Sequence, residues 1–285
     1  MLQFALVNLL NPLVLSIFFL WTSASLVAGE LRFYPVPADV VQARMDRLKQ
    51  KNEDRGNEVR LMFEEAGCKG EDLTQEKPEG GKSNVVCRLK GQTDETIVVG
   101  AHFDHVTKGS GAVDNWSGVS LLPSLFTSLS RLSARRYTWI LIGFAREEQG
   151  LIGSSQYVRS LSKEQLAKVQ AMINIDSIGM DSPKIWVQRS DPRLVRAAAA
   201  LAKAVAVVIE GVDIQQVGDS DSHPFQARKI PVLDIHSVTQ ENLAILHSER
   251  DIRTAVSDAH HYQTYQFLAA LTAWLDENFT RIPKQ

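Results

Sequence analysis

Charged residues are missing from the start of this 285-residue chain, where Glu30 is the first Lys, Arg, Asp or Glu. A helix buried in a soluble domain normally keeps a polar stripe, so residues 1–29 instead favour an export signal or a membrane anchor. The stretch has no basic start and its apolar run is long, which leaves an uncleaved anchor as open as a cleaved signal. No Cys follows that run directly, which argues against a bacterial lipid anchor. We expect an exported protein that is periplasmic, extracellular or tethered to the membrane by this segment.

An excess of positive charge is also lacking, since 31 Lys and Arg residues face 33 Asp and Glu residues. The chain therefore has no electrostatic basis for binding nucleic acid. Internal repeats are absent too, which argues against a repeat architecture. The composition, 44% hydrophobic and 22% charged, is ordinary for a globular protein, and residues 30–285 suit one domain.

Cysteine is scarce, and the only two are Cys68 and Cys87. In an exported chain they would meet an oxidising compartment, where they could pair as a local staple. Two buried free thiols are the alternative, because the sequence does not fix the distance between them. The sequence leaves the pairing open.

The spacing of apolar residues predicts alternating strands and helices. Helices are expected over residues 38–66, 119–132, 156–170, 194–208 and 259–279. Strands are expected over residues 84–90, 96–101, 137–145, 171–176, 184–188 and 231–235. This alternation indicates an α/β fold, a three-layer α/β/α sandwich around a mixed, centrally parallel sheet.

Ionisable side chains follow three of these strands at the point where each strand ends. They are His102 and Asp104, then Glu147 and Glu148, and then Asp176. Taken singly, each is more often a hydrogen-bonding residue, a helix cap or a solvated charge. Ligand sites of such sheets form at the carboxyl ends of the strands, so the repeated placement predicts a functional site there.

Five segments carry the candidate chemistry. They are AHFD at 101–104, VDNWSG at 113–118, AREEQGLIGS at 145–154, NIDSIG at 174–179 and LHSERD at 246–251. Together, in this order, they resemble the di-zinc exopeptidases of metallopeptidase family twenty-eight, which include secreted bacterial aminopeptidases, glutamate carboxypeptidases and, more distantly, glutaminyl cyclases. The resemblance runs from about Arg60 to the C-terminus and implies a zinc exopeptidase-like fold.

The resemblance implies a centre of two zinc ions. His102 and Asp176 would hold one ion, Glu148 and His247 would hold the other, and Asp114 would bridge both. Imidazole and carboxylate groups suit zinc, and a carboxylate can give one oxygen to each of two ions about 3.5–4 Å apart.

Two catalytic roles are implied as well. Glu147 would be the general base, because its side chain diverges from that of Glu148 and stays free to take a proton from water. Asp104 would orient the ring of His102. Family members also often have a cis peptide bond after the bridging carboxylate, here between Asp114 and Asn115.

The leading prediction is an aminopeptidase that hydrolyses the N-terminal bond of a peptide or amino-acid amide. A carboxypeptidase on the same scaffold is an alternative and would need cations such as Arg146, Arg189 or Arg228 to grip a terminal carboxylate. Another amidohydrolase is also open. A glutaminyl cyclase uses one zinc ion and lacks part of this ligand set, and a receptor-like relative usually loses ligands or the base. All five ligand positions and the general base Glu147 are present here, which argues against a cyclase and against a receptor-like protein.

Residues around the constellation carry further expectations. Asp251 is expected to order the loop after the last zinc ligand. Leu246 replaces an aromatic residue that can touch the substrate in several relatives, so that contact is expected to be absent. His260 and His261 are expected at the surface of the terminal helix.

Overall fold

The computed structural model describes residues 31–75, 83–214 and 218–282. The segment expected to be a signal or anchor, residues 1–29, lies outside these residues. Within them, no helix combines the length and the apolar character that crossing a bilayer requires.

A single mixed sheet runs through the described part of the chain, in the order β1-β2-β4-β3-β5-β8-β6-β7. Its strands are β1 (Leu73–Gln75), β2 (Val85–Leu89), β3 (Thr96–His102), β4 (Thr138–Phe144), β5 (Val169–Ile175), β6 (Lys184–Ile185), β7 (Glu210–Gly211) and β8 (Val232–His236). The four central strands β4, β3, β5 and β8 are parallel, whereas β2 and β6 run antiparallel to their inner neighbours. The expected mixed sheet with a parallel centre is confirmed.

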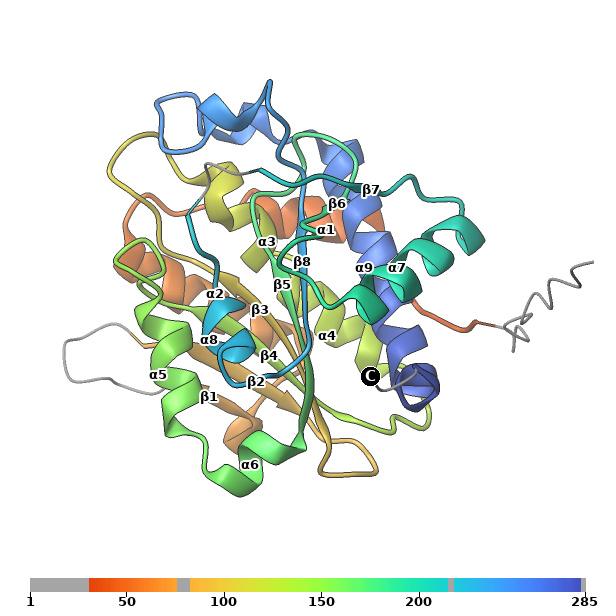
Figure 1. Cartoon of the computed structure of the whole chain (residues 1–285). Coiled ribbons are helices and arrows are strands. Elements are labelled where there is room, and N and C mark those ends of the chain that lie inside the picture. The colour runs from red at the N-terminus through yellow and green to blue at the C-terminus, as the bar shows by residue number, and fades with distance from the viewer. Residues whose placement is uncertain (1–30, 76–82, 215–217, 283–285) are drawn as a thin grey trace, which may run out of the picture. The chain divides into compact units, whose positions relative to one another are not determined.

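Helices cover both faces of this sheet (Figure 1). They are α1 (Ala38–Met45), α2 (Asn52–Ala66), α3 (Ser117–Val119), α4 (Leu122–Ser130), α5 (Ile152–Ser160), α6 (Lys163–Lys168), α7 (Pro192–Ala204), α8 (His223–Gln226) and α9 (Asp258–Asn278). Side chains alternate across β3, because successive residues of a strand point to opposite faces. Ile97 and Val99 join the larger core beneath α1, α2, α4, α7 and α9, and Val98 joins the smaller core beneath α5, α6 and α8. These two cores make the three layers.

The helix predicted over residues 38–66 is wrong as one element. It divides into α1 and α2, and Arg47 and Lys49 in the break both pair with Glu58, at 2.5 and 3.1 Å. A straight helix of that length would extend about 43 Å. The break instead lets Val41 of α1 and Met62 of α2 bury in the same core.

Two other elements are shorter than predicted. Residues 156–170 do not form one helix, because Ser162 caps a new helix, α6, and the chain enters β5 at Val169. The strand predicted over 184–188 stops at Ile185, after which Trp186 donates its backbone N–H to Asp234 and the chain turns.

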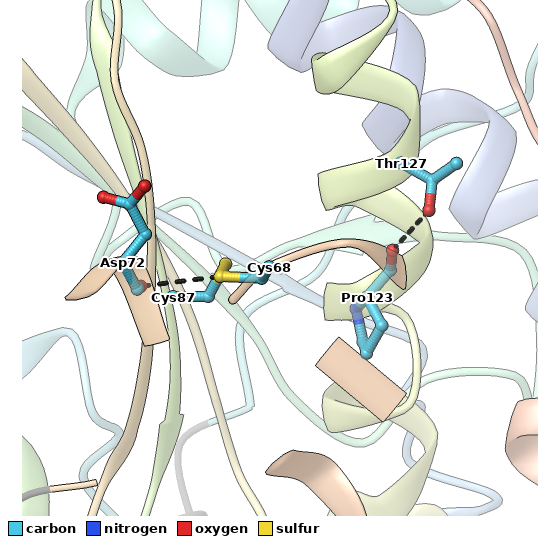
Figure 2. Close-up of a disulfide and its surroundings, with 5 residues drawn as sticks. All are labelled: Cys68, Asp72, Cys87, Pro123 and Thr127. Atoms are coloured by element: carbon cyan, nitrogen blue, oxygen red, sulfur yellow. Dashed lines mark hydrogen bonds between the residues drawn. A yellow bond between two sulfur atoms is a disulfide. The ribbon is translucent and has the colours of Figure 1, made fainter. Parts of the chain in front are cut away.

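A disulfide joins Cys68 to Cys87, with 6.2 Å between their Cα atoms (Figure 2). Gly67 ends α2 in a left-handed conformation, with φ of 104°, which turns Cys68 toward the sheet. Cys87 lies in β2, so the bond ties the end of α2 to the sheet. The structure thereby selects the paired alternative.

Candidate active site

Three parallel strands deliver ionisable side chains to the same edge of the sheet. His102 is the last residue of β3, Glu147 and Glu148 follow β4, and Asp176 follows β5 directly. Because β4, β3 and β5 are adjacent and parallel, their carboxyl ends meet. The Nε2 atom of His102 lies 3.6 Å from Oδ1 of Asp176 and 3.9 Å from Oε2 of Glu147.

Asp114 lies between the two predicted histidine ligands. It belongs to the short helical segment η2 (Ala112–Trp116), which is kinked at this residue. Its Oδ1 is 3.1 Å from Nε2 of His102, and its Oδ2 is 3.1 Å from Nε2 of His247. The peptide bond from Asp114 to Asn115 is cis, as expected. Each carboxylate oxygen thus faces a different histidine, which is the arrangement a bridging ligand requires.

The five predicted metal ligands therefore form two groups that share Asp114. One is His102, Asp114 and Asp176, and the other is Asp114, Glu148 and His247; within each group the candidate ligand atoms lie within 4.8 Å of one another. In the second group, Nε2 of His247 is 3.1 Å from Oε2 of Glu148. The other oxygen of Glu148 is buried without a hydrogen-bond partner, which fits a metal ligand. The donor set of imidazoles and carboxylates suits zinc.

Electrostatics at the site favour cations. Although burial opposes protonation of His102, the charges of Glu147 and Asp176 raise its pKa well above the ordinary value. Hydrogen bonds to Asp114 and Glu148 raise the pKa of His247 to about 10. Carboxylates crowded in a buried space thus draw protons onto both histidines, and divalent cations would offset the same negative charge.

Glu147 lies beside the first group. Burial raises the pKa of its carboxyl group to about 9, and the carboxylates of Asp221 and Asp176 add to the rise while His102 opposes it. A raised pKa at a carboxyl group next to candidate ligands is typical of acid–base residues. Asp221 itself is buried.

Asp104 contacts the ring of His102 through its backbone carbonyl and not, as predicted, through its side chain. The ring of His102 places Nδ1 at 3.0 Å from the backbone carbonyl of Asp104, whereas the nearer carboxylate oxygen is 3.8 Å away. That carboxylate instead accepts hydrogen bonds from the backbone N–H groups of Glu147 at 3.0 Å and Glu148 at 3.3 Å. Asp104 thus orients the ring through its main chain and fixes the Glu147–Glu148 turn through its side chain.

Asn115 joins the Asp114 turn to the end of β5. Its side-chain amide donates to the carbonyl of Ile175 at 2.9 Å, and its oxygen accepts from the backbone N–H of Ser177 at 3.2 Å. These bonds hold Asp114 beside Asp176. The sequence segment included Asn115, but nothing in the pattern indicated this partner.

Asp251 connects the loop of His247 to the turn that carries Asp114. Its carboxylate accepts hydrogen bonds from the backbone N–H groups of Val113 at 2.6 Å and Asp114 at 3.2 Å. Because Asp251 follows His247 by four residues, it connects the loop of one candidate ligand to the turn of another. Its contacts thus reach Asp114, the candidate bridging residue.

Several residues at the site have a left-handed backbone. His247 has φ of 54°, Arg146 before Glu147 has φ of 62°, and Ser177 after Asp176 has φ of 51°. This conformation is uncommon outside glycine and is held where surrounding contacts impose it. His247 is itself a candidate ligand, and Arg146 and Ser177 adjoin Glu147 and Asp176.

One surface expectation is wrong. His261 is buried, and its Nε2 atom lies 2.9 Å from the backbone carbonyl of Ser117, because α9 packs this side of its first turn against the Asp114 turn. Leu246 lines a pocket next to Asp176. His260 is only partly buried.

That pocket opens beside the first group of ligands. Its lining residues are Asn174, Asp176, Ser177, Trp186, Ile214, Ser220, Asp234, Ile235, His236, Val238 and Leu246. Asp234 accepts hydrogen bonds from Ser220 and Ser222, and both ring nitrogens of His236 bond to the backbone of Val212 and Val238. With these polar groups already bonded, the pocket presents mainly apolar surface.

The three candidate arginines do not line this pocket. Arg189 stacks on Trp186, with its guanidinium 3.8 Å from the ring centroid, and pairs with Asp219. Arg146 bonds to Gln149 at the exposed side of its turn. Among the described lining residues, none is Lys or Arg.

The fold and the site define an α/β protein with a candidate two-metal centre at the carboxyl edge of its sheet. The model of Peptidase family M28 matches residues 84–272. The chain belongs to this family.

Similar proteins agree with this assignment. Leupeptin-inactivating enzyme 1 of Streptomyces exfoliatus is 31% identical over 193 residues, which are 67% of this chain and 41% of that protein. The LapA aminopeptidase of Legionella pneumophila has a TM-score of 0.73 at 19% identity, over 85% of this chain and 70% of that one. A glutaminyl cyclase of an Acidobacteriales bacterium has a TM-score of 0.67 at 18% identity, over 88% and 99%. At these identities the two structures show the shared fold, and the chain spans about two fifths of the first relative's length.

Proposed function

We propose that this chain is a zinc-dependent aminopeptidase with two metal ions. The observation that carries the proposal is Asp114, whose two carboxylate oxygens each lie 3.1 Å from a different histidine of the site. His102 and Asp176 would complete one ion's ligands, and Glu148 and His247 the other's. Bound zinc supplies Lewis acidity, which polarises a carbonyl group and activates water.

Glu147 is the proposed general base. Its carboxylate reaches to 3.9 Å from Nε2 of His102 and is not needed to complete either ligand group. With the negative charge around it offset, it would accept the proton of the attacking water and pass it to the leaving amine. Asp104 supports this role by holding the backbone N–H of Glu147.

The pocket supports an aminopeptidase over a carboxypeptidase. A terminal carboxylate needs a cation, and the described lining offers none. A free amino group suits the carboxylate-rich metal edge, while the first side chain of the substrate would enter the apolar pocket. We therefore propose peptides or amino-acid amides with an apolar first residue as substrates.

The disulfide supports one further proposal, that the chain is exported. Disulfides such as the one between Cys68 and Cys87 persist in oxidising compartments. Residues 1–29 would act as the signal or the membrane anchor.

The proposal is tested on the purified full chain with four kinds of substrate: free-amine anilides, N-blocked peptides, C-terminal reporters and N-terminal glutaminyl peptides. We expect cleavage of the first kind only, its loss with a chelator, its return with zinc, and its loss in Glu147→Gln. Turnover of C-terminal reporters alone would make the protein a carboxypeptidase, and cyclisation of the glutaminyl peptide a cyclase. A chain that binds no zinc would refute the mechanism.

A further inference from the structure

Arg55 is a buried cation behind the candidate metal centre. It lies in the first turn of α2, and it is fully buried. Its guanidinium bonds to main-chain carbonyl groups: Nε to Lys49 at 2.8 Å, Nη1 to Phe103 at 3.1 Å and Gly111 at 3.3 Å, and Nη2 to Ser110. Among the described residues, no carboxylate forms an ion pair with it within 4.0 Å, so its donors serve the backbone.

Three of the carbonyl groups that Arg55 contacts, those of Phe103, Ser110 and Gly111, lie at the two ends of one loop. Phe103 follows the ligand His102 directly, and Gly111 precedes the bridging Asp114 by three residues. A planar guanidinium has its donors in fixed directions. The guanidinium therefore contacts the chain just after His102 and again just before Asp114. One rigid group thus sets the distance between these two parts of the loop.

The loop is held on two further sides. Asn52, one turn before Arg55, bonds through its side chain to the N–H and the carbonyl of His105, at 3.1 and 3.0 Å. On the opposite side, a Cβ atom on Gly109 would lie 2.4 Å from the carbonyl oxygen of Ser248, in the segment after His247. These two contacts hold the middle of the loop, whereas Arg55 holds its two ends at Phe103 and Gly111.

Arg55 also keeps its charge. Burial lowers its pKa to about 10, while the nearby carboxylates of Asp251 and Asp104 oppose that shift. A cation at neutral pH accounts for strong hydrogen bonds to the carbonyl groups. A neutral side chain of similar length would leave buried acceptors without donors.

We propose that Arg55 is a positioning residue for the metal centre, and that its guanidinium fork fixes the separation of His102 and Asp114 and thereby sets zinc affinity. The inference rests on the proposed function, because it requires the centre to bind zinc. Arg55 touches neither the pocket lining nor the ligand side chains, so its effect on substrate affinity should be small.

The test is zinc affinity of the full chain, measured by competition with a chromophoric chelator. Arg55→Met should weaken zinc binding by about 10–100-fold, the usual effect of losing an outer partner of a metal site. Arg55→Lys keeps the charge but replaces the fork with a single ammonium, so it should remain clearly weaker than wild type. Arg60→Met is the matched control, since Arg60 lies on the same helix in a partly exposed pair with Glu64 and should stay within twofold of wild type.

Activity at saturating zinc gives a second readout: KM should stay within about twofold of wild type while the zinc requirement rises. Wild-type zinc affinity in Arg55→Met, or full rescue by Arg55→Lys, would overturn the inference. If Arg55→Met does not fold, Arg55→Lys alone decides, because it keeps the charge and loses the fork, and wild-type zinc affinity there would overturn the inference equally. Wild-type protein that binds no zinc would instead overturn the proposed function.

Discussion

Replacing Asp251 is expected to weaken both the fold and the metal centre. Its carboxylate is buried and accepts hydrogen bonds from the N–H groups of Val113 and Asp114. Asp251→Ala leaves both donors buried without an acceptor, and each such loss costs about 1–3 kcal/mol. The free energy of unfolding should therefore fall by about 2–6 kcal/mol. Asp251→Asn keeps one acceptor oxygen, so its free energy of unfolding should fall by about half as much.

The effect on zinc follows from the same bonds. Asp251 fixes the backbone of the proposed bridging residue and lies in the segment of His247, so its loss releases both relative to each other. Loss of an outer partner typically lowers metal affinity about 10–100-fold. Asp251→Ala should show this drop, and Asp251→Asn a smaller one.

Urea unfolding and a zinc competition titration measure the two effects. Glu249→Ala is the control, because Glu249 is exposed in the same segment and its removal should change stability by less than about 0.5 kcal/mol. The reasoning is refuted if Asp251→Ala unfolds like the control and binds zinc with wild-type affinity. A stability loss with unchanged zinc affinity would keep the structural role and reject the link to the metal.

Three other outcomes follow from single contacts. Glu147→Gln should lower kcat by about 10²–10⁴-fold with zinc content unchanged, as expected for a lost general base, and metal analysis beside steady-state kinetics checks it. Replacing Cys68 and Cys87 by Ser should lower the unfolding free energy by about 3 kcal/mol, because the disulfide closes a loop whose ends are 19 residues apart. The prediction is contradicted if the reduced and the oxidised wild-type proteins unfold at the same urea concentration. Burial lowers the pKa of His261 to about 4, below its unfolded value of about 6.5. Its contribution to the free energy of unfolding is therefore complete above pH 6.5 and is lost as the pH falls toward 4. The loss amounts to about 3 kcal/mol at 1.36 kcal/mol per pKa unit. His261→Gln should flatten this part of the stability profile, measured by urea unfolding at several pH values, and an unchanged slope would rule the assignment out.

The parallel centre of the sheet could be predicted from the sequence because its strands are buried on both faces. Strands β3, β4, β5 and β8 therefore appear as short apolar runs between polar segments, and each prediction overlapped the observed strand. The helix over 38–66 failed for the opposite reason. At its break, Arg47 and Lys49 pair with Glu58 of α2, and apolar spacing does not encode such contacts.

The candidate ligands could be found because several short segments occur together. His102 and Asp176 follow apolar strands, and the resemblance of the five segments to a known family added the roles of Asp114, Glu148 and His247. The structure brings all five predicted ligand positions together. The pattern did not, however, predict that Asp104 reaches the ring of His102 through its carbonyl group, since the backbone is the same in every residue.

The residues that position the candidate ligands could not be predicted from the sequence, because they bind main-chain groups. Arg55 bonds to three carbonyl groups of the loop before Asp114, Asp251 binds two N–H groups beside it, and Asn115 binds the carbonyl of Ile175. Every residue carries the same backbone groups, so no residue pattern in the sequence marks which side chain will bind them. They are also distant in sequence: 59 residues separate Arg55 from Asp114, and 137 separate Asp114 from Asp251. The candidate metal centre therefore depends on two kinds of residue: ligands whose types the sequence reveals, and side chains whose backbone contacts only the folded chain shows.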